Sequence, residues 1–297
     1  MKFAVVLPIW QLSTDDADFL TTAAEKLGFD AVLIPDHIVA PPATMEHYGP
    51  IWPDIFTLLG YLAARTNRIQ LGSSVVVMPY RNPLVVAKCV ATVDQVSRGR
   101  FIFGIGVGWD EEEFQLLRIP FRERGAMTDE YLRIMKAAWA QEEPRYEGAY
   151  FNLAGFKCEP KPVQTPHPPI WVGCSPMTAT GVGLRRTAEL GDAWHPVFCS
   201  MDEIRRGAQL LREYAAKVGR DKPPALAPRN LLNITERPKD GDRGLFEGSP
   251  EQIAADIKEM ERLGVDYICF DVFSRPTPAG MAGLMEQFMA EVRPLLN

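Results

Sequence analysis

The chain has 297 residues, of which 46% are hydrophobic and 24% charged, with a formal net charge of -6 and an isoelectric point near 5.4. This length and apolar content suit one large α/β domain or two smaller ones. The sequence has no basic stripe, which disfavours a nucleic-acid partner. No run approaches the roughly 18 apolar residues of a membrane span, and the N-terminal apolar run is too short for a signal peptide.

The five cysteines are spread through the chain without a C-x-x-C pair; they are Cys89, Cys158, Cys174, Cys199 and Cys269. An odd and dispersed set favours neither a disulfide framework nor a zinc site and is typical of a reducing compartment. No carboxylate cluster of the metal-site type is present either. We therefore predict a cytoplasmic protein without a bound metal.

Taken in chain order, strand patterns alternate with helical patterns along the sequence. The predicted strands are 3–7, 31–34, 69–77, 101–105, 169–172, 193–197, 225–234 and 267–272. The predicted helices are 15–27, 54–64, 84–96, 122–139, 178–190, 201–218, 250–263 and 280–295. No hairpin signal separates the repeating units, so the strands should be parallel with helical crossovers. Eight units predict a (β/α)₈ TIM barrel, and a doubly wound open sheet is the alternative.

Two segments exceed what a bare barrel needs, which predicts insertions after strands 4 and 7. Residues 141–168 include the stretch 146–155, which has the pattern of a small hairpin, followed by a proline-rich run. Residues 236–248 are polar and glycine-rich and have the character of a mobile loop, of the kind that often forms a lid. Neither segment resembles a domain boundary, so residues 1–297 are predicted to form a single domain.

The third strand has an unusual order of side-chain sizes. Gly72, Ser73 and Ser74 are small, Val75 to Val77 are bulky, and Pro79 ends the strand. Strand stability does not require such a step, whereas close passage of the backbone along a flat ligand would account for it. In a (β/α)₈ barrel the ligand site lies where the strands end, so we examined the residues that follow each strand.

His37 follows the second strand and is the strongest candidate for acid–base chemistry. An imidazole gains or loses a proton near neutral pH, and the adjacent Asp36 is placed to bias its charge. The alternative is a strand-end histidine that only satisfies a backbone group. His195 also ends a strand, but Pro196 follows and no acid is adjacent in sequence, so we interpret it as a wall residue.

Glycines follow the fourth strand, in Gly104-Ile-Gly-Val-Gly108, and Trp109 comes next. The pattern differs from a dinucleotide fingerprint, and the acidic residues 110–113 disfavour a pyrophosphate there. The glycines, with Val107 between Gly106 and Gly108, are better explained by close approach of the backbone to a planar ligand. The acidic run is by default a solvated helix start that the helix dipole favours.

Residues Gly173, Cys174 and Ser175 precede a predicted helix that begins at Thr178, which is a favourable anion-binding arrangement. Arg185 and Arg186 lie on the same helix. A plain N-cap explains the same residues equally well. Cys174 at a helix start also has the position of a nucleophile, but no local base accompanies it.

With these residues in view, the sequence resembles the luciferase-like monooxygenase superfamily, and more closely its branch that depends on the deazaflavin coenzyme F420. The segments that carry the resemblance are 25–32 (EKLGFDAV), 36–37 (DH), 69–75 (IQLGSSV), 81–83 (RNP), 94–100 (DQVSRGR), 104–109 (GIGVGW), 169–173 (PIWVG), 188–194 (AELGDAW), 248–251 (GSPE) and 263–266 (LGVD). They are spread over nearly the whole chain, and they are more specific for the superfamily than for a cofactor or substrate.

The resemblance implies a barrel in which an isoalloxazine-type ring lies across the strand ends. It implies a cis peptide between Ser74 and Val75 that backs the ring. It places Asp36 and His37 at the ring, with the histidine near the reacting carbon, and the cofactor phosphate at 173–175. Many relatives have a glycine or another small residue in place of Cys174, which weakens the phosphate assignment. Deazaflavin sugar dehydrogenases carry a catalytic glutamate near the position of Trp109, so the tryptophan argues against that activity.

The resulting hypothesis is an oxidoreductase that uses coenzyme F420 for hydride transfer to or from a small, fairly apolar organic substrate. His37 would exchange the proton, and the cofactor would lie against the residues named above at 36, 74–75, 106–108 and 173–175. Trp10, Trp52, Trp109 and His195 would line the substrate side. The alternatives are a monooxygenase that uses reduced FMN and O₂, and a non-catalytic flavin-binding barrel. Relatives are often dimers or larger, which implies a homo-oligomer.

Overall fold

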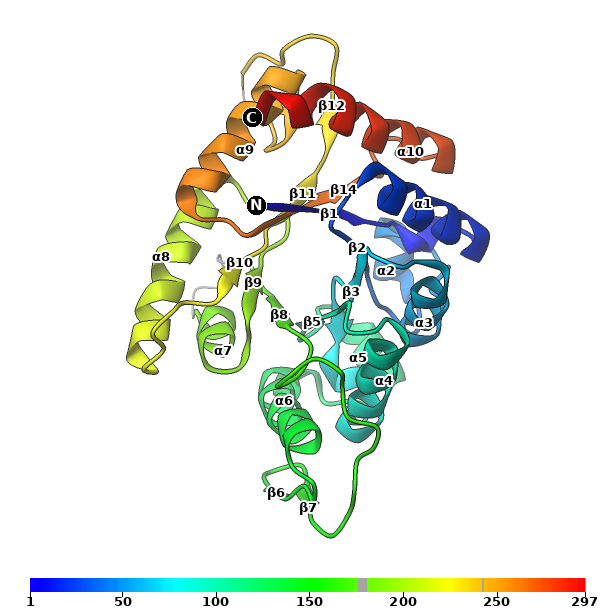
Figure 1. Cartoon of the computed structure of the whole chain (residues 1–297). Helices are drawn as coiled ribbons and strands as arrows, with labels where there is room; N and C mark the ends of the chain where they lie inside the picture. The colour runs from blue at the N-terminus through cyan, green and yellow to red at the C-terminus, as the bar shows by residue number, and fades with distance from the viewer. Residues whose placement is uncertain (176–180, 242, 297) are drawn as a thin grey trace.

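A curled sheet of parallel strands forms the centre of the molecule (Figure 1), in the order β10-β9-β8-β5-β3-β2-β1-β14-β11. The computed structural model describes residues 1–175, 181–241 and 243–296. The strands of this sheet are β1 Lys2–Val6, β2 Ala31–Ile34, β3 Gln70–Ser73, β4 Val76–Val77, β5 Phe101–Gly106, β8 Ile170–Gly173, β9 Ala193–His195, β10 Ala225–Leu226, β11 Arg229–Leu231 and β14 Tyr267–Asp271. All their pairings are parallel, as predicted from the absence of hairpin signals.

Two of the predicted strands are each divided in two. The third becomes β3 and β4, and β4 pairs with the end of β5, so the chain bulges at Ser74 and Val75. The seventh becomes β10, which pairs with β9, and β11, which pairs with β14. A further bridge joins Val197 to Arg229. Residues 225–231 therefore make backbone hydrogen bonds to strands on both sides, and the sheet curls back toward itself.

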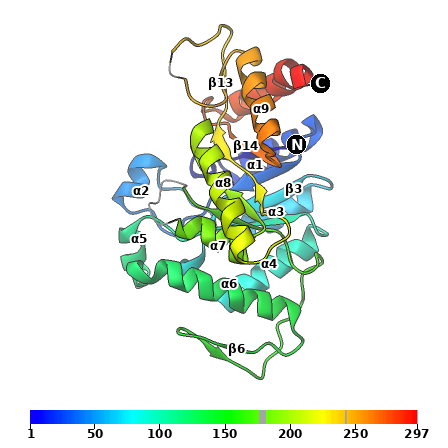
Figure 2. The same ribbon diagram turned by 90° about the vertical axis from the view of Figure 1, so that its left-hand side faces the viewer.

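The long helices lie on the convex side of the curl (Figure 1), which differs from the doubly wound alternative, where helices cover both faces of an open sheet. They are α1 Thr14–Leu27, α3 Ile55–Arg65, α4 Pro83–Val96, α6 Arg124–Ala140, α7 Val182–Leu190, α8 Met201–Lys217, α9 Pro250–Leu263 and α10 Pro278–Gln287. The predicted start of α7 at Thr178 lies outside the described residues. Of the two short helices, α2 Pro42–His47 was not predicted, whereas α5 Glu111–Leu116 begins at the acidic run that was expected to start a helix; both project on the side away from the chain's N-terminus (Figure 2).

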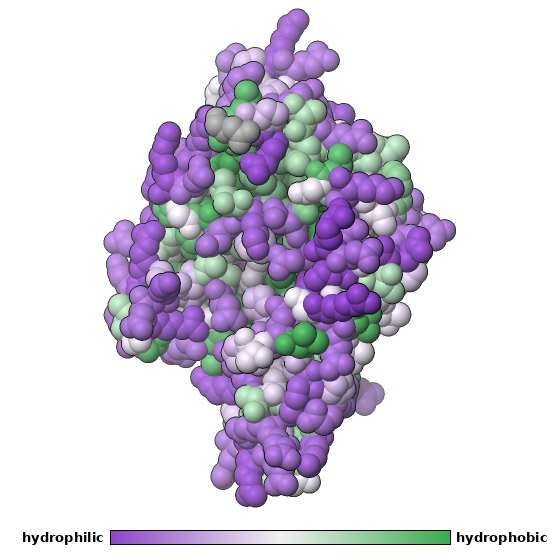
Figure 3. Space-filling model, in the orientation of Figure 1, coloured by the Kyte–Doolittle hydropathy of each residue, from purple (hydrophilic) through white to green (hydrophobic). Residues whose placement is uncertain are grey.

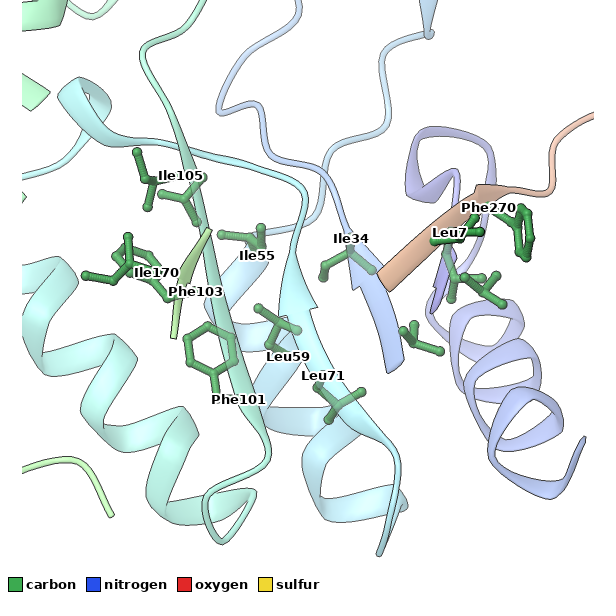
Figure 4. Packing of buried hydrophobic residues seen from close by; sticks show 14 of the residues in the cluster. Leu7, Ile34, Ile55, Leu59, Leu71, Phe101, Phe103, Ile105, Ile170 and Phe270 are labelled. Carbon is green, nitrogen blue, oxygen red and sulfur yellow. The ribbon is translucent and has the colours of Figure 1, made fainter. Parts of the chain in front are cut away.

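Both faces of the strands are buried, because alternate side chains point outward to the helices and inward to the curl. Outward-facing residues such as Leu7, Ile34, Leu71 and Phe101 pack with Leu59 of α3 and the other helices (Figure 4). A separate inner cluster consists of residues from six strands and the β10–β11 link, most of them small or medium in size: Ala4, Val6, Ala31, Leu33, Ile102, Trp171, Ala193, Ala227 and Cys269. This inner packing closes the space beneath the carboxyl ends of the strands.

The segment 141–168 contains the hairpin expected within 146–155, since β6 Tyr146–Glu147 pairs antiparallel with β7 Asn152–Leu153. It projects away from the sheet (Figures 1 and 2), and the corresponding end of the molecule is hydrophilic in the view of Figure 3. In the segment 236–248, β13 Glu247–Gly248 pairs with β12 Asn233–Ile234. Arg243 there forms two hydrogen bonds to Asp256 of α9, and Phe246 is fully buried, so its described residues are anchored to the body.

Within the ranges that the structure describes, no helix is long and apolar enough to cross a membrane.

Candidate active site

A cavity of about 340 Å³ opens at the carboxyl ends of the strands and collects nearly all the predicted site residues. Its lining includes Trp10, Asp36, His37, Trp52, Ser74, Val75, Gly106, Val107, Gly108, Trp109, Gly173, Cys174 and Ser175, all of which were predicted. It also includes Pro35, Tyr48, Val77, Val197 and Arg229, which were not. A more open groove of about 720 Å³ runs along α8, but it lies away from the strand ends, where ligand sites of such sheets are found.

His37 is held by a carboxylate that the sequence analysis missed. Its Nδ1 lies 2.5 Å from Oε2 of Glu113, which is fully buried. The same carboxylate accepts hydrogen bonds from the Tyr80 hydroxyl (2.8 Å) and from the backbone N–H groups of Ile38 (2.7 Å) and Val39 (3.1 Å). An ionised carboxylate only accepts, so Nδ1 of His37 is the donor, and Nε2 is left to exchange a proton in the cavity.

Asp36 forms its hydrogen bonds with Arg81 and Val77, not with the adjacent His37. Both its oxygens accept from the Arg81 guanidinium, at 2.6 and 2.8 Å, and one also accepts from Val77 N–H. This bidentate pair fixes the end of β2 against β4 and leaves Asp36 charged but compensated. Asp36 therefore shapes the cavity wall, and the partner of His37 comes from α5.

Only two of the four acidic residues 110–113 are exposed to solvent, which corrects the expectation that the whole run is a solvated helix start. Glu111 and Glu112 are exposed, but Asp110 and Glu113 are buried. Asp110 caps α5 and accepts a 2.5 Å hydrogen bond from the Thr44 hydroxyl of α2. Asp110 and Glu113 together therefore tie the segment 37–48 to α5, which positions one whole side of the cavity.

The floor of the cavity is the bulge between β3 and β4, where the Ser74–Val75 peptide bond is cis, as expected from the family resemblance. Glycines lie around this bond at positions where a larger residue would clash with its neighbours. A Cβ on Gly106 would lie 2.6 Å from Val75 Cγ2, and one on Gly173 would lie 2.9 Å from Val75 Cγ1. A Cβ on Gly104 would collide with the Ser73 carbonyl. The absence of side chains at these three glycines therefore provides the space that the bulge at Ser74 and Val75 occupies. It also leaves the floor of the cavity with little side-chain bulk.

His195 lies beneath this floor and is not part of the cavity lining, so its expected place on the substrate side is corrected. It is fully buried, and its Nδ1 lies 2.6 Å from the Ala227 carbonyl, while Nε2 lies 2.7 Å from Ser74 Oγ. Since a carbonyl only accepts, Nδ1 carries the proton and Nε2 accepts from the serine hydroxyl. Burial lowers the pKa of His195 to about 4, and the charge of Arg229 acts in the same direction. His195 is thus a neutral support for Ser74.

Arg229 of β11 provides the second support of the floor. Its Nη1 donates to the Ser74 carbonyl oxygen at 2.8 Å and to Ser74 Oγ at 3.1 Å. Nε and Nη2 donate to the two oxygens of Asp271 at the end of β14, at 2.8 and 2.7 Å. The guanidinium lines the cavity, but its charge is compensated by a fully buried carboxylate.

Aromatic rings form a second part of the cavity lining. The Trp10 and Tyr48 ring centroids are 5.0 Å apart, those of His37 and Trp52 4.6 Å, and those of His37 and Trp109 5.9 Å. About half of the Trp109 surface is exposed, so this ring lies at the mouth. These rings offer large apolar surface with few polar groups, which suits a flat or apolar ligand.

The predicted anion-binding stretch is described only in part. Gly173, Cys174 and Ser175 line the cavity, whereas Thr178 lies outside the described residues. Arg186 is paired with Asp129 and donates to the Gly125 carbonyl, so its charge is already engaged. Burial raises the pKa of the Cys174 thiol to about 11, which opposes the nucleophile reading. Among the described residues no cluster of three or more His, Cys, Asp or Glu side chains has the arrangement of a metal site.

Comparison with protein families decides the affiliation. The model of the luciferase-like monooxygenase family matches residues 1–237. The chain belongs to this family. An uncharacterized relative from Mycobacterium tuberculosis is 30% identical over 279 residues, which are 87% of this chain and 97% of that protein. The region that matches the family model therefore includes most strands of the sheet and all the residues that line the cavity, from Trp10 to Arg229.

Named relatives in the family use two different cofactors. The F420-dependent glucose-6-phosphate dehydrogenase of Kineococcus radiotolerans is 27% identical, and the alignment covers 95% of this chain and 92% of that one. The FMNH(2)-dependent dimethylsulfone monooxygenase of Pseudomonas putida is also 27% identical, over 72% of this chain and 60% of its own length.

Solved structures share the fold. The monooxygenase RslO1 from Streptomyces bottropensis superposes with a TM-score of 0.83 at 24% identity, and the match covers 99% of both chains. An F420-dependent secondary alcohol dehydrogenase superposes with a TM-score of 0.82 at 18% identity, over 100% of this chain and 99% of that chain. At these identities the similarity establishes the α/β fold with its curled parallel sheet.

Proposed function

We propose that the protein is an oxidoreductase that uses coenzyme F420 for hydride transfer to or from a small organic substrate. The observation that carries the proposal is the His37–Glu113 pair at the edge of an apolar cavity with a flat floor. Hydride transfer to a carbonyl or from an alcohol also requires a proton to move at oxygen, and a positioned imidazole performs that task near neutral pH.

The lining residues fit a flat ring. The floor at Val75 is flanked by Gly106 and Gly173, where even a Cβ would be crowded, and aromatic rings form another part of the lining. The cavity of about 340 Å³ is close in size to known ligand sites, which begin near 300 Å³. In this proposal the residues at 36, 74–75, 106–108 and 173–175 hold the cofactor. When bound, the deazaflavin would supply or accept a hydride.

The chain's own residues supply orientation and a proton. Glu113 fixes the tautomer of His37, so that Nε2 faces the bound substrate, and it stabilises the imidazolium when that nitrogen takes a proton. Tyr80 and the two backbone N–H groups hold the carboxylate in turn, which keeps the ring in one orientation. Glu113 is therefore a positioning residue that acts through His37.

The substrate in this proposal is uncharged. The two arginines at the cavity, Arg81 and Arg229, are each bound in a bidentate ion pair, with Asp36 and Asp271 respectively. A phosphate or carboxylate on the substrate would therefore find no uncompensated positive charge among the described lining residues. Trp109 stands near the place where sugar dehydrogenases of the family have a glutamate. Together these features disfavour a sugar phosphate.

The alternative with support of its own is a monooxygenase that uses reduced FMN and O₂. It is favoured by the family model and by the FMNH(2)-dependent relative, and the same flat floor would accept a flavin ring. The third possibility is a barrel that binds a flavin without catalysis.

A cofactor screen separates these possibilities. Fluorescence titrations of the purified protein with F420 and with FMN, each oxidised and reduced, should give tighter binding for F420. Turnover of an alcohol and ketone panel should proceed without oxygen consumption. Tighter binding of FMN with oxygen uptake would favour the monooxygenase, and tight binding without any turnover would favour the binding protein.

The same proposal includes the wider organisation of the chain. Residues 225–231 make the contacts that would close a complete (β/α)₈ barrel, with the segments 141–168 and 236–248 as its insertions. Residues 1–297 would act as one unit, because β14 pairs with β1 although it lies beyond the region of the family model. A cytoplasmic location and a homodimeric or larger assembly complete the hypothesis.

A further inference from the structure

Tyr48 is a polar residue of the cavity lining that the mechanism above does not use. The residue follows α2 and lines the cavity together with His37, Trp10, Trp52 and Trp109. Its phenol makes no hydrogen bond to any residue within the ranges that the structure describes. Tyr48 is half-buried, with its ring packed against other rings, so its hydroxyl is available to a polar ligand atom in the cavity.

The Tyr48 ring is held in place on several sides. Its centroid lies 5.0 Å from that of Trp10, 6.0 Å from that of Trp52 and 6.5 Å from that of Trp109. Its backbone N–H donates to the Thr44 carbonyl at 2.9 Å. The Thr44 hydroxyl in turn donates to the buried Asp110. The phenol is therefore fixed before any ligand arrives, which lowers the entropic cost of using it.

The position of Tyr48 relative to His37 gives the hydroxyl a specific task. The two ring centroids are 6.2 Å apart, and the rings are inclined by only 36°. Both rings line the same cavity, so a ligand oxygen bound between them can contact both polar groups.

We propose that Tyr48 binds the substrate oxygen at which His37 exchanges its proton, so that the substrate class is a small neutral ketone or secondary alcohol. The inference rests on the proposed function and goes further by naming the recognised group. A substrate without an oxygen on the reacting carbon would leave both the Tyr48 hydroxyl and His37 Nε2 unpaired, and a polar site rejects such analogues.

In the direction of reduction, bound reduced F420 would supply a hydride to the carbonyl carbon, and the carbon–oxygen π electrons would move to the oxygen. The oxygen takes the proton from His37 Nε2, while the Tyr48 hydroxyl donates a hydrogen bond to the same oxygen and keeps its own proton. The negative charge that develops on the oxygen is thereby shared between two donors.

Tyr48→Phe tests the proposal, because phenylalanine keeps the ring contacts and removes only the hydroxyl. The matched control is Tyr61→Phe on α3, which lies outside the cavity lining. We expect kcat/KM for the best ketone or alcohol of the panel to fall about 10- to 100-fold in Tyr48→Phe, the usual cost of one hydrogen bond to a developing charge. The F420 dissociation constant and the melting temperature should stay within error of wild type, as should all three quantities in the control.

Three results would overturn the proposal, and they are distinguishable. If the wild type turns over the panel with F420 and kcat/KM changes less than threefold in Tyr48→Phe, the role of Tyr48 is wrong and the proposed function stands. If Tyr48→Phe loses F420 affinity in parallel with kcat/KM, the hydroxyl serves the cofactor instead. If the wild type neither binds F420 nor turns over any ketone or alcohol, the proposed function and the role of Tyr48 fail together.

Discussion

His37 Nδ1 lies 2.5 Å from Oε2 of the fully buried Glu113, although 76 positions separate the two residues in the chain. The contact joins the loop after β2 to the helix after β5, two connections that meet only when their strands are placed in one sheet. Because the carboxylate also holds the backbone of Ile38 and Val39, the same group fixes the loop and orients the imidazole.

Glu113→Gln should lower kcat at least tenfold. The amide oxygen can still accept from the Ile38 and Val39 N–H groups, but its NH₂ group would face the Nδ1–H of His37, so the tautomer is no longer enforced. Steady-state kinetics with F420 measure the loss, and the F420 dissociation constant should not change. The control is Glu112→Gln, whose exposed side chain is one residue away. Unchanged kcat in Glu113→Gln would remove Glu113 from the mechanism.

Gly106→Ala should destabilise the fold by about 1–3 kcal/mol, the usual cost of overpacking. The new methyl group would lie 2.6 Å from Val75 Cγ2. In the double variant with Val75→Ala, part of this loss should be recovered, since the clashing methyl group is gone. Denaturant unfolding gives the four free energies of the cycle. Gly60→Ala, in open space on α3, should instead be neutral or stabilising. Additive effects at 75 and 106 would show that the contact does not limit this site.

The free energy of unfolding should depend on His195 below neutral pH. Burial lowers the folded-state pKa to about 4, below the unfolded value near 6.5, so the unfolded chain binds a proton first as the pH falls. The stability is complete above pH 6.5 and is lost progressively toward pH 4, by about 2 kcal/mol between pH 7 and pH 5. His195→Gln should remove this part of the pH dependence, and His47→Gln, at an exposed position, should not. Equal pH slopes in all three proteins would contradict the assignment.

Cys174 should be a poor nucleophile despite its place in the cavity lining. Burial raises the pKa of its thiol to about 11, so at pH 8 only about one thiol in a thousand is ionised. Alkylation by iodoacetamide, followed by mass spectrometry of the native protein, should be far slower at Cys174 than for a free thiol. Cys174→Ala should retain at least half of the wild-type kcat. Rapid labelling together with loss of activity in the alanine variant would restore the nucleophile interpretation.

The sequence pattern predicted the alternation of strands and helices and the strand ends where the site lies, because burial imposes regular hydrophobic spacing on both. It did not predict that strand 7 is divided into β10 and β11. The two segments are distinguished by their pairing partners, because β10 pairs with β9 and β11 pairs with β14. Hydrogen-bond partners across the sheet leave no local trace in the sequence.

The candidate site was predicted less completely, for a related reason. Four consecutive acids look alike in sequence, yet only Asp110 and Glu113 face the protein interior, and the position of Glu113 beside the fully buried Phe114 was the one available hint. His195 was misplaced because a strand-end position does not reveal whether a side chain points into the cavity or below its floor. Tyr48 was missed because it follows a short helix in a connection without periodic pattern.

The central claim, that His37 exchanges the proton in a hydride transfer that depends on F420, is tested most directly by the kcat of His37→Ala. The measurement follows the visible absorbance of F420 during turnover of the best alcohol of the panel, with the F420 dissociation constant determined alongside. We expect a loss of about 10²-fold or more in kcat with F420 binding retained. A loss below about tenfold would contradict it and would leave His37 as a structural residue at the end of β2.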